Sequence, residues 1–173
     1  IIKYSGETKR EAEDPMGPNE EIDPFAAPLD PRRAHLLTAS SFGAAVGLSS
    51  YVPPKALWQL RIGQIVDERQ ETAAMRHGCA TEGVARRAYA RMFPQHHLSP
   101  GGFHIHPRQP FLGATPDALA GETGLIEIKS PMHGLYMTIP PHYMAQVQGQ
   151  LACCGRDWAH FVVYYKPPGG EEE

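Results

Sequence analysis

The stretch that decides the fold runs from residue 111 to residue 129 and reads Phe-Leu-Gly-Ala-Thr-Pro-Asp-Ala-Leu-Ala-Gly-Glu-Thr-Gly-Leu-Ile-Glu-Ile-Lys. Residues 111–114 and 125–129 have the short alternating pattern of β-strands. Residues 120–124, between them, form a typical turn sequence rich in Gly and Thr. We therefore expect the two strands to pair as a hairpin.

The second strand of this hairpin carries charge on one face. Because side chains alternate along a strand, Glu127 and Lys129 lie on the same face. Ile126 and Ile128 lie on the opposite face, toward the core. The turn brings Asp117, ten residues before Glu127, back beside it.

Two carboxylates next to an ammonium group suit metal-dependent hydrolysis of a phosphodiester. Asp117 and Glu127 offer the hard oxygen ligands that Mg²⁺ prefers, and a bound Mg²⁺ neutralises phosphate and activates water. Lys129 can orient or deprotonate the attacking water and offset developing charge. A plain ion pair between Glu127 and Lys129, with Asp117 as a turn residue, is the alternative interpretation.

Two helical segments carry further candidates. Glu82 lies in the long helical pattern of residues 72–92, where it could reach the same metal or pair with Arg86 at i+4. Three glutamines lie in a second helical pattern: Gln146, Gln148 and Gln150. Gln146 and Gln150 share one side of that helix, whereas Gln148 lies about 200° around from Gln146. Their amides could donate to phosphate, although glutamine is also an ordinary helix former.

A candidate anion cradle lies near the start of the folded region. Arg33 supplies a guanidinium group, and Thr38 and Ser40 supply hydroxyls beside a short predicted helix. A simple helix N-cap is the alternative interpretation. His104 and His106 share a strand face, but no third residue has zinc-like spacing, and the three cysteines form no Cys-x-x-Cys pair.

The order of elements along the chain indicates the fold class. We expect helices over residues 53–65, 72–92 and 140–154, and strands over 102–106 and 158–165 in addition to the hairpin. This order predicts one α/β domain with a central mixed sheet flanked by helices.

Charge divides the chain into three parts. We expect residues 1–31 to form a flexible, acidic, Pro-rich arm, residues 32–166 the folded domain, and residues 167–173 an acidic tail. The net charge of the whole chain is −3, but residues 31–170 have 13 Lys and Arg against 8 Asp and Glu. A basic domain suits a polyanionic partner, although such an excess is also common on solvated surfaces.

Several protein classes are disfavoured by composition. No apolar run of about 18 residues is present, so we expect no membrane span, and the N-terminal sequence lacks the apolar segment of a signal peptide. Three cysteines cannot form a disulfide framework. We expect an intracellular, reducing location, in the cytoplasm or the nucleus.

Five ordered sequence blocks resemble the λ-exonuclease or YqaJ-like viral recombinase family. They are Arg33 with 37–40, 75–82, 111–119, 125–129 and 140–150. The resemblance covers about residues 32–166. It implies the restriction-endonuclease-like PD-(D/E)xK nuclease fold.

This resemblance implies a metal-dependent exonuclease that digests duplex DNA from its 5′ ends and leaves 3′ single strands. It implies Mg²⁺ as the cofactor, with Mn²⁺ as a substitute. By position, Asp117, Glu127 and the Ile128 carbonyl would bind the metal, with Glu82 assisting, and Lys129 would be the catalytic lysine.

The resemblance also implies a site for the terminal 5′-phosphate. Arg33 and Ser40 would hold it with Thr115, which stands where the phage enzyme has serine. A glutamine would help, and we favour Gln148 over Gln146.

The implied partners are double-stranded DNA ends, a single-strand annealing protein and further copies of the chain. A homotrimer follows from resemblance alone, and a monomer stays open. Three alternative functions also stay open: a structure-specific endonuclease, an RNase on the same fold, and an inactive module that binds nucleic-acid ends.

Overall fold

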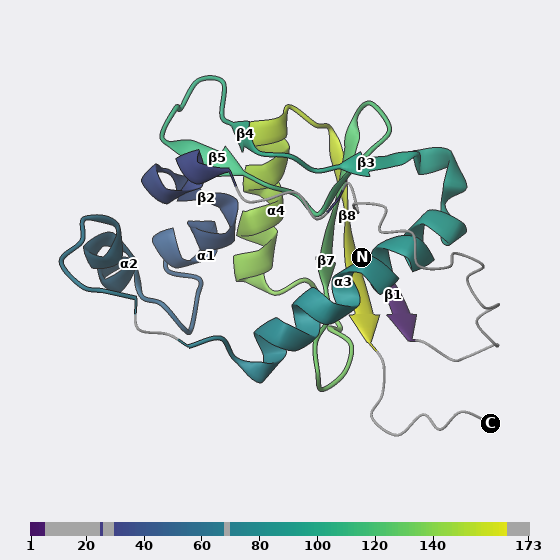
Figure 1. The fold of residues 1–173 in the computed structure, drawn as a ribbon, viewed down its shortest axis with the longest axis horizontal. Helices are drawn as coiled ribbons and strands as arrows, with labels where there is room; N and C mark the ends of the chain where they lie inside the picture. The colour runs from purple at the N-terminus through teal and green to yellow at the C-terminus, as the bar shows by residue number, and fades with distance from the viewer. Residues whose placement is uncertain (6–24, 26–29, 68–69, 166–173) are drawn as a thin grey trace.

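The computed structural model describes residues 1–5, 25, 30–67 and 70–165 (Figure 1). Ile2–Ser5 form strand β1, which pairs in parallel with the last strand of the domain. The expectation that all of residues 1–31 form a flexible arm is therefore wrong for this segment, because a paired strand has its backbone groups satisfied. The rest of the expected arm, 6–24 and 26–29, and the expected tail lie outside the described residues.

A five-stranded mixed sheet forms the centre of the molecule. Its strand order is β1-β8-β7-β6-β3, with β3 spanning Leu98–Pro100, β6 Ala118–Ala120, β7 Gly124–Lys129 and β8 Trp158–Tyr165. Strand β7 is central, parallel to β8 and antiparallel to β6. This sheet confirms the predicted fold class.

The predicted hairpin forms, but its first strand differs from the expected one. The partner of β7 is β6, with Ala118 opposite Ile126. Residues 111–114 contribute instead to a second sheet, in which β5 (Leu112–Ala114) lies between β2 (Leu37–Thr38) and β4 (His104–Ile105). Pro116, which lacks a backbone N–H, lies between β5 and β6, so the chain leaves one sheet and enters the other there.

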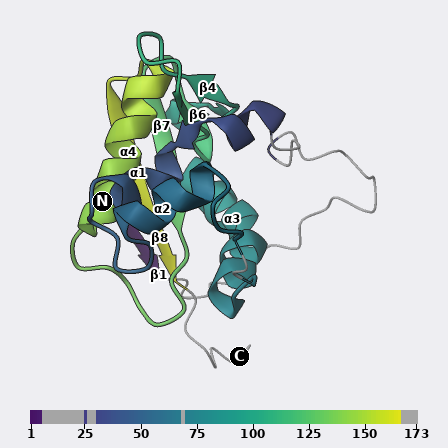
Figure 2. The same cartoon turned by 90° about the vertical axis from the view of Figure 1, so that its left-hand side faces the viewer.

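Two long helices cover opposite faces of the five-stranded sheet, as Figure 2 shows on either side of β7 and β8. Helix α3 (Ala73–Met92) packs Ala85 and Tyr89 against Ile126 and Ile128. Helix α4 (Pro141–Cys154) packs against the other face through Val147. The face that carries Glu127 therefore lies under α4.

The ends of these helices follow from the sequence. The Thr72 side chain accepts a hydrogen bond from the backbone N–H of Met75 and caps α3. Helix α4 begins after Pro140 and ends at Gly155, whose φ of 61° is easily adopted only by glycine. Helix α2 (Pro54–Arg61) is shorter than the predicted 53–65 helix.

Four short helices lie in the described part of the chain. Helix η1 (Pro31–His35) precedes β2, and η3 (Pro94–His96) lies between α3 and β3. Helices η2 (Ala39–Ser41) and α1 (Phe42–Ala45) follow β2 and pack against α4. Among the described residues, no helix has both the length and the apolar character that crossing a bilayer needs.

Helices α1 and α4 approach closely because α4 has a glycine at the contact. A Cβ atom added to Gly149 would lie 2.1 Å from the Phe42 ring. We predict that Gly149→Ala lowers the free energy of unfolding by about 1–3 kcal/mol, because the ring has to move. Denaturant titration followed by circular dichroism measures this change.

Gly78→Ala in α3 is the matched control. A Cβ atom at Gly78 would meet nothing within 4 Å, so alanine there should stabilise the helix by up to about 1 kcal/mol. Equal effects of the two substitutions would contradict the close packing of α1 on α4.

Candidate active site

The centre of the candidate site is the carboxylate of Glu127, on β7. Glu127 is only 1% exposed. Its Oε1 accepts hydrogen bonds from Gln146 Nε2 and Lys129 Nζ, each at 2.6 Å, and its Oε2 accepts one from Gln150 Nε2 at 2.6 Å. A buried carboxylate is tolerated only with such compensation. The sheet thus presents a buried carboxylate to α4 and surrounds it with donors.

Asp117 lies beside Glu127, as the hairpin predicts. Strand β6 begins at Ala118, which pairs with Ile126, so Ile128 lies beyond the last residue of β7 that pairs with β6. Asp117 Oδ2 accepts that N–H at 2.5 Å and replaces the missing strand. Burial raises the pKa of Asp117 well above its ordinary value, and the neighbouring charges of Glu127 and Glu82 raise it further.

Lys129 is held as a cation by these two acids. Burial alone would lower the pKa of its ammonium group, but the charges of Glu127 and Asp117 outweigh burial and raise the pKa. Its Nζ also lies 4.9 Å from the centre of the Tyr143 ring, which favours the cation. The neighbouring acids therefore favour the protonated form of Lys129.

Glu82 approaches the site from the helix on the other face of the sheet. It forms an ion pair with Arg86, one turn along α3, which is the alternative that the sequence left open. Its charge nevertheless reaches Asp117. Arg86 lies 4.3 Å from the ring centre of Phe25, which covers it. Glu82 is thus near the carboxylates without being one of their hydrogen-bonding partners.

The donor set fits a divalent cation. Burial raises the pKa of Asp117 and the charge of Glu127 raises it further, so a bound cation would favour the ionised form of Asp117. Within the described ranges, no three His, Cys, Asp or Glu side chains are grouped as metal ligands. A metal here would be held by the carboxylates of Asp117 and Glu127, with the Ile128 carbonyl as the adjacent backbone oxygen.

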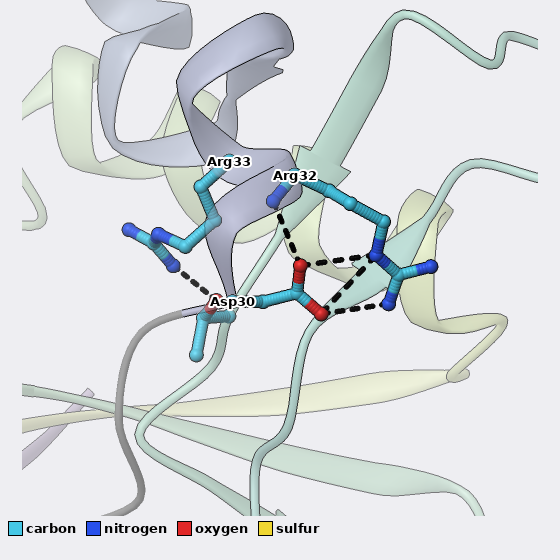
Figure 3. A network of polar contacts seen from close by, with 4 residues as sticks. Asp30, Arg32 and Arg33 are labelled. Carbon is cyan, nitrogen blue, oxygen red and sulfur yellow. Dashed lines mark hydrogen bonds and ion pairs between the residues drawn. The ribbon is translucent and has the colours of Figure 1, made fainter.

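Arg33 and Thr115 come together at one side of the site. Arg33 Nη1 donates to the hydroxyl of Thr115, and the Thr115 carbonyl accepts from Gln150 Nε2 at 3.4 Å. Figure 3 shows Arg32 turned toward Asp30 and Arg33 extending away from both. Asp30 holds Arg32 through hydrogen bonds to its backbone N–H and guanidinium group. Arg33 is therefore the arginine of η1 that faces the site.

The other predicted phosphate-binding residues are placed less closely. Ser40 is exposed on η2, with its hydroxyl 3.3 Å from that of Thr38. Gln148 is exposed on α4, and its amide contacts Met144 Sδ at 3.9 Å. The structure brings Gln146 to Glu127 and does not bring Gln148 there, so the preference for Gln148 stays a prediction about bound DNA.

Gln150 is the contact to Glu127 that the sequence analysis did not select. Its i, i+4 spacing from Gln146 was the available signal, because both then face one side of α4. The histidines set aside as zinc ligands have other partners. His104 Nε2 donates to the Gly101 carbonyl at 2.7 Å, and His106 Nδ1 accepts the backbone N–H groups of residues 108 and 109.

Comparisons with known proteins agree with this geometry. A family model described as the YqaJ-like viral recombinase domain matches residues 30–157. The crystal structure of an alkaline exonuclease, LHK-Exo from Laribacter hongkongensis, is 33% identical, with a TM-score of 0.62 over 77% of this chain and 71% of that one. LHK-Exo in complex with dAMP gives 33% identity and a TM-score of 0.63 over 76% and 70%. No curated protein matches the chain.

The raised pKa of Asp117 predicts a pH-dependent stability change for Asp117→Asn. The ordinary pKa is 3.8, so the unfolded chain loses this proton at lower pH than the folded one, and the ionised form destabilises the fold as pH rises. Without metal, we predict that Asp117→Asn unfolds at a higher temperature than the wild type at pH 8. The difference should vanish below pH 3.8, where the Asp117 carboxyl is protonated in both the folded and the unfolded chain.

Calorimetry in the presence of a chelator measures both melting temperatures. A variant that melts below the wild type at pH 8 would show that the Asp117 carboxylate stabilises the metal-free fold, which would contradict the raised pKa of Asp117.

Proposed function

The chain belongs to the YqaJ-like viral recombinase domain family and is similar to the alkaline exonuclease LHK-Exo, and we propose that it is a Mg²⁺-dependent 5′→3′ exonuclease acting on duplex DNA ends. The product would be duplex DNA with 3′ single strands. The observation that carries this proposal is the buried Glu127 carboxylate, held by three donors beside Asp117. Even with such partners, a buried charge often stabilises a fold no more than apolar side chains of similar volume would. The presence of a carboxylate here therefore supports a functional role.

The two carboxylates would hold the metal, with the Ile128 carbonyl and Glu82 as the further oxygens nearby. A bound Mg²⁺ would supply Lewis-acid stabilisation of the phosphate and a more acidic water. Holding a cation requires the ionised form of Asp117, and burial raises the pKa of Asp117 in the metal-free protein. Metal binding should therefore release a proton and strengthen with rising pH.

Lys129 would act as a cation rather than as a base. Its pKa is raised by Glu127 and Asp117, so it carries a proton at neutral and mildly alkaline pH. A fixed ammonium group beside the scissile phosphate offsets the negative charge that grows in the transition state. The Tyr143 ring and Glu127 hold that group in place.

Arg33 would select DNA ends that carry a 5′-phosphate. It reaches the site through Thr115, which is two residues before Asp117. Guanidinium and hydroxyl groups are good donors to a terminal phosphate, and Ser40 and Gln148 could add donors once DNA is bound. A phosphate held there would place the adjacent phosphodiester at the carboxylates.

We predict that Glu127→Gln and Lys129→Met each lower the rate of nucleotide release from linear duplex DNA at least about 100-fold. Glu127→Gln removes the charge that binds metal, and Lys129→Met removes the cation at the phosphate. Release of nucleotides from end-labelled DNA in Mg²⁺ measures the rate.

Arg156→Ala is the matched control. Arg156 is half-buried and donates to the Gly121 carbonyl in the turn at the far end of the hairpin, so its loss should leave the rate unchanged. Wild-type cleavage by either site variant would refute the assignment. Digestion of covalently closed circular DNA as fast as linear DNA would identify an endonuclease instead.

We predict that Arg33→Ala lowers the preference for 5′-phosphate over 5′-hydroxyl ends by about 10-fold or more, because a hydrogen bond to a charged group contributes about 1.5–3 kcal/mol. Initial rates on the two DNA ends give the ratio. Arg32→Ala is the control, since Asp30 holds that guanidinium and the ratio should stay at the wild-type value. An equal loss in both variants would mean that general basic charge, not a phosphate contact, sets the preference.

A further inference from the structure

We propose that Gln150 is a positioning residue that orients the one oxygen of Glu127 left open to a cation. This inference rests on the proposed metal-dependent function. It assigns a role to a side chain that contacts neither metal nor DNA, and that acts through the carboxylate it holds.

The two oxygens of Glu127 are occupied unequally. Oε1 accepts from both Gln146 Nε2 and Lys129 Nζ at 2.6 Å, whereas Oε2 accepts from Gln150 Nε2 alone at 2.6 Å. A carboxylate oxygen has about two lone-pair positions. Oε1 is therefore saturated by its two donors, and Oε2 has one position left for a metal ion.

The Gln150 side chain is fully buried, where an amide is unfavourable unless hydrogen bonds satisfy it. Gln150 is 0% exposed. Its Oε1 atom is buried and has no hydrogen-bond partner among the described residues. An unpaired buried amide oxygen destabilises the fold, and an apolar side chain of similar length would avoid that penalty. The hydrogen bond from Nε2 to Glu127 therefore accounts for an amide at this position.

Gln150 also connects the carboxylate to the neighbouring segment. Its Nε2 lies 3.4 Å from the Thr115 carbonyl oxygen, and the Thr115 hydroxyl accepts a hydrogen bond from the Arg33 guanidinium group. One amide therefore contacts both the metal-binding acid of β7 and the residue that precedes Pro116 and Asp117. A shift of this amide would move Glu127 relative to Asp117.

The test compares Mn²⁺ binding to the metal-free wild type with binding to Gln150→Met, by isothermal titration without DNA. Met has a similar length but no N–H, so Glu127 keeps Gln146 and Lys129 and loses the donor on Oε2. We expect the dissociation constant for Mn²⁺ to rise about 10- to 100-fold, as for other outer partners of metal ligands. The Mg²⁺ concentration for half-maximal cleavage should rise in parallel, while kcat at saturating Mg²⁺ changes much less.

Val147→Ala is the control for a merely structural effect. Val147 is buried in the same helix and packs on Phe161 and Val163, and its side chain has no polar atom that could hold Glu127. It should lower the melting temperature and leave the Mn²⁺ affinity unchanged. Gln150→Asn, which withdraws the amide by one methylene, should weaken Mn²⁺ binding as Gln150→Met does.

Wild-type Mn²⁺ affinity in folded Gln150→Met or Gln150→Asn would overturn the positioning role while leaving the proposed nuclease intact. A wild-type protein that binds no Mn²⁺ would instead overturn the proposed function, and that result appears before any substitution is made.

Discussion

The structure depends on one buried charge, the carboxylate of Glu127 on the central strand of the sheet. Removing such a group from water has a large desolvation penalty, and hydrogen bonds from an ammonium group and two amides offset that penalty here. The donors come from the strand itself and from α4, so the helix can pack in only one register on this face. The stability of the fold and the proposed cation site thus depend on the same set of contacts.

Much of the fold follows from local patterns in the sequence. The two long helices and the last strand occupy the predicted residues, because Thr72, Pro140 and Gly155 mark helix ends chemically. The misplaced hairpin partner has a different cause. The strands that pair are only three residues long on one side, and such short runs carry too little alternation to separate β6 from β5. The pairing of Ile2–Ser5 with β8 joins the two ends of the sequence, which no local pattern reveals.

The candidate site was predictable where chemistry and spacing coincide. The turn before β7 places Asp117 beside the Glu127–Lys129 pair, and the structure brings these three together. The choice among the glutamines was not predictable, because the sequence gives helix spacing but not which side faces the sheet. The buried side of α4 carries Gln146 and Gln150, and Gln148 is exposed. The sequence also left two roles open for Glu82, an ion pair with Arg86 and a place near the carboxylates. The structure shows the ion pair, and the charge of Glu82 also raises the pKa of Asp117.

The most direct measurement of the central claim is a crystal structure of the wild-type protein grown with Mn²⁺, with anomalous scattering used to locate the ion. The account predicts one anomalous peak in contact with a carboxylate oxygen of Asp117 and with Oε2 of Glu127. An anomalous peak bound elsewhere, or no peak between these two side chains at saturating Mn²⁺, would contradict it.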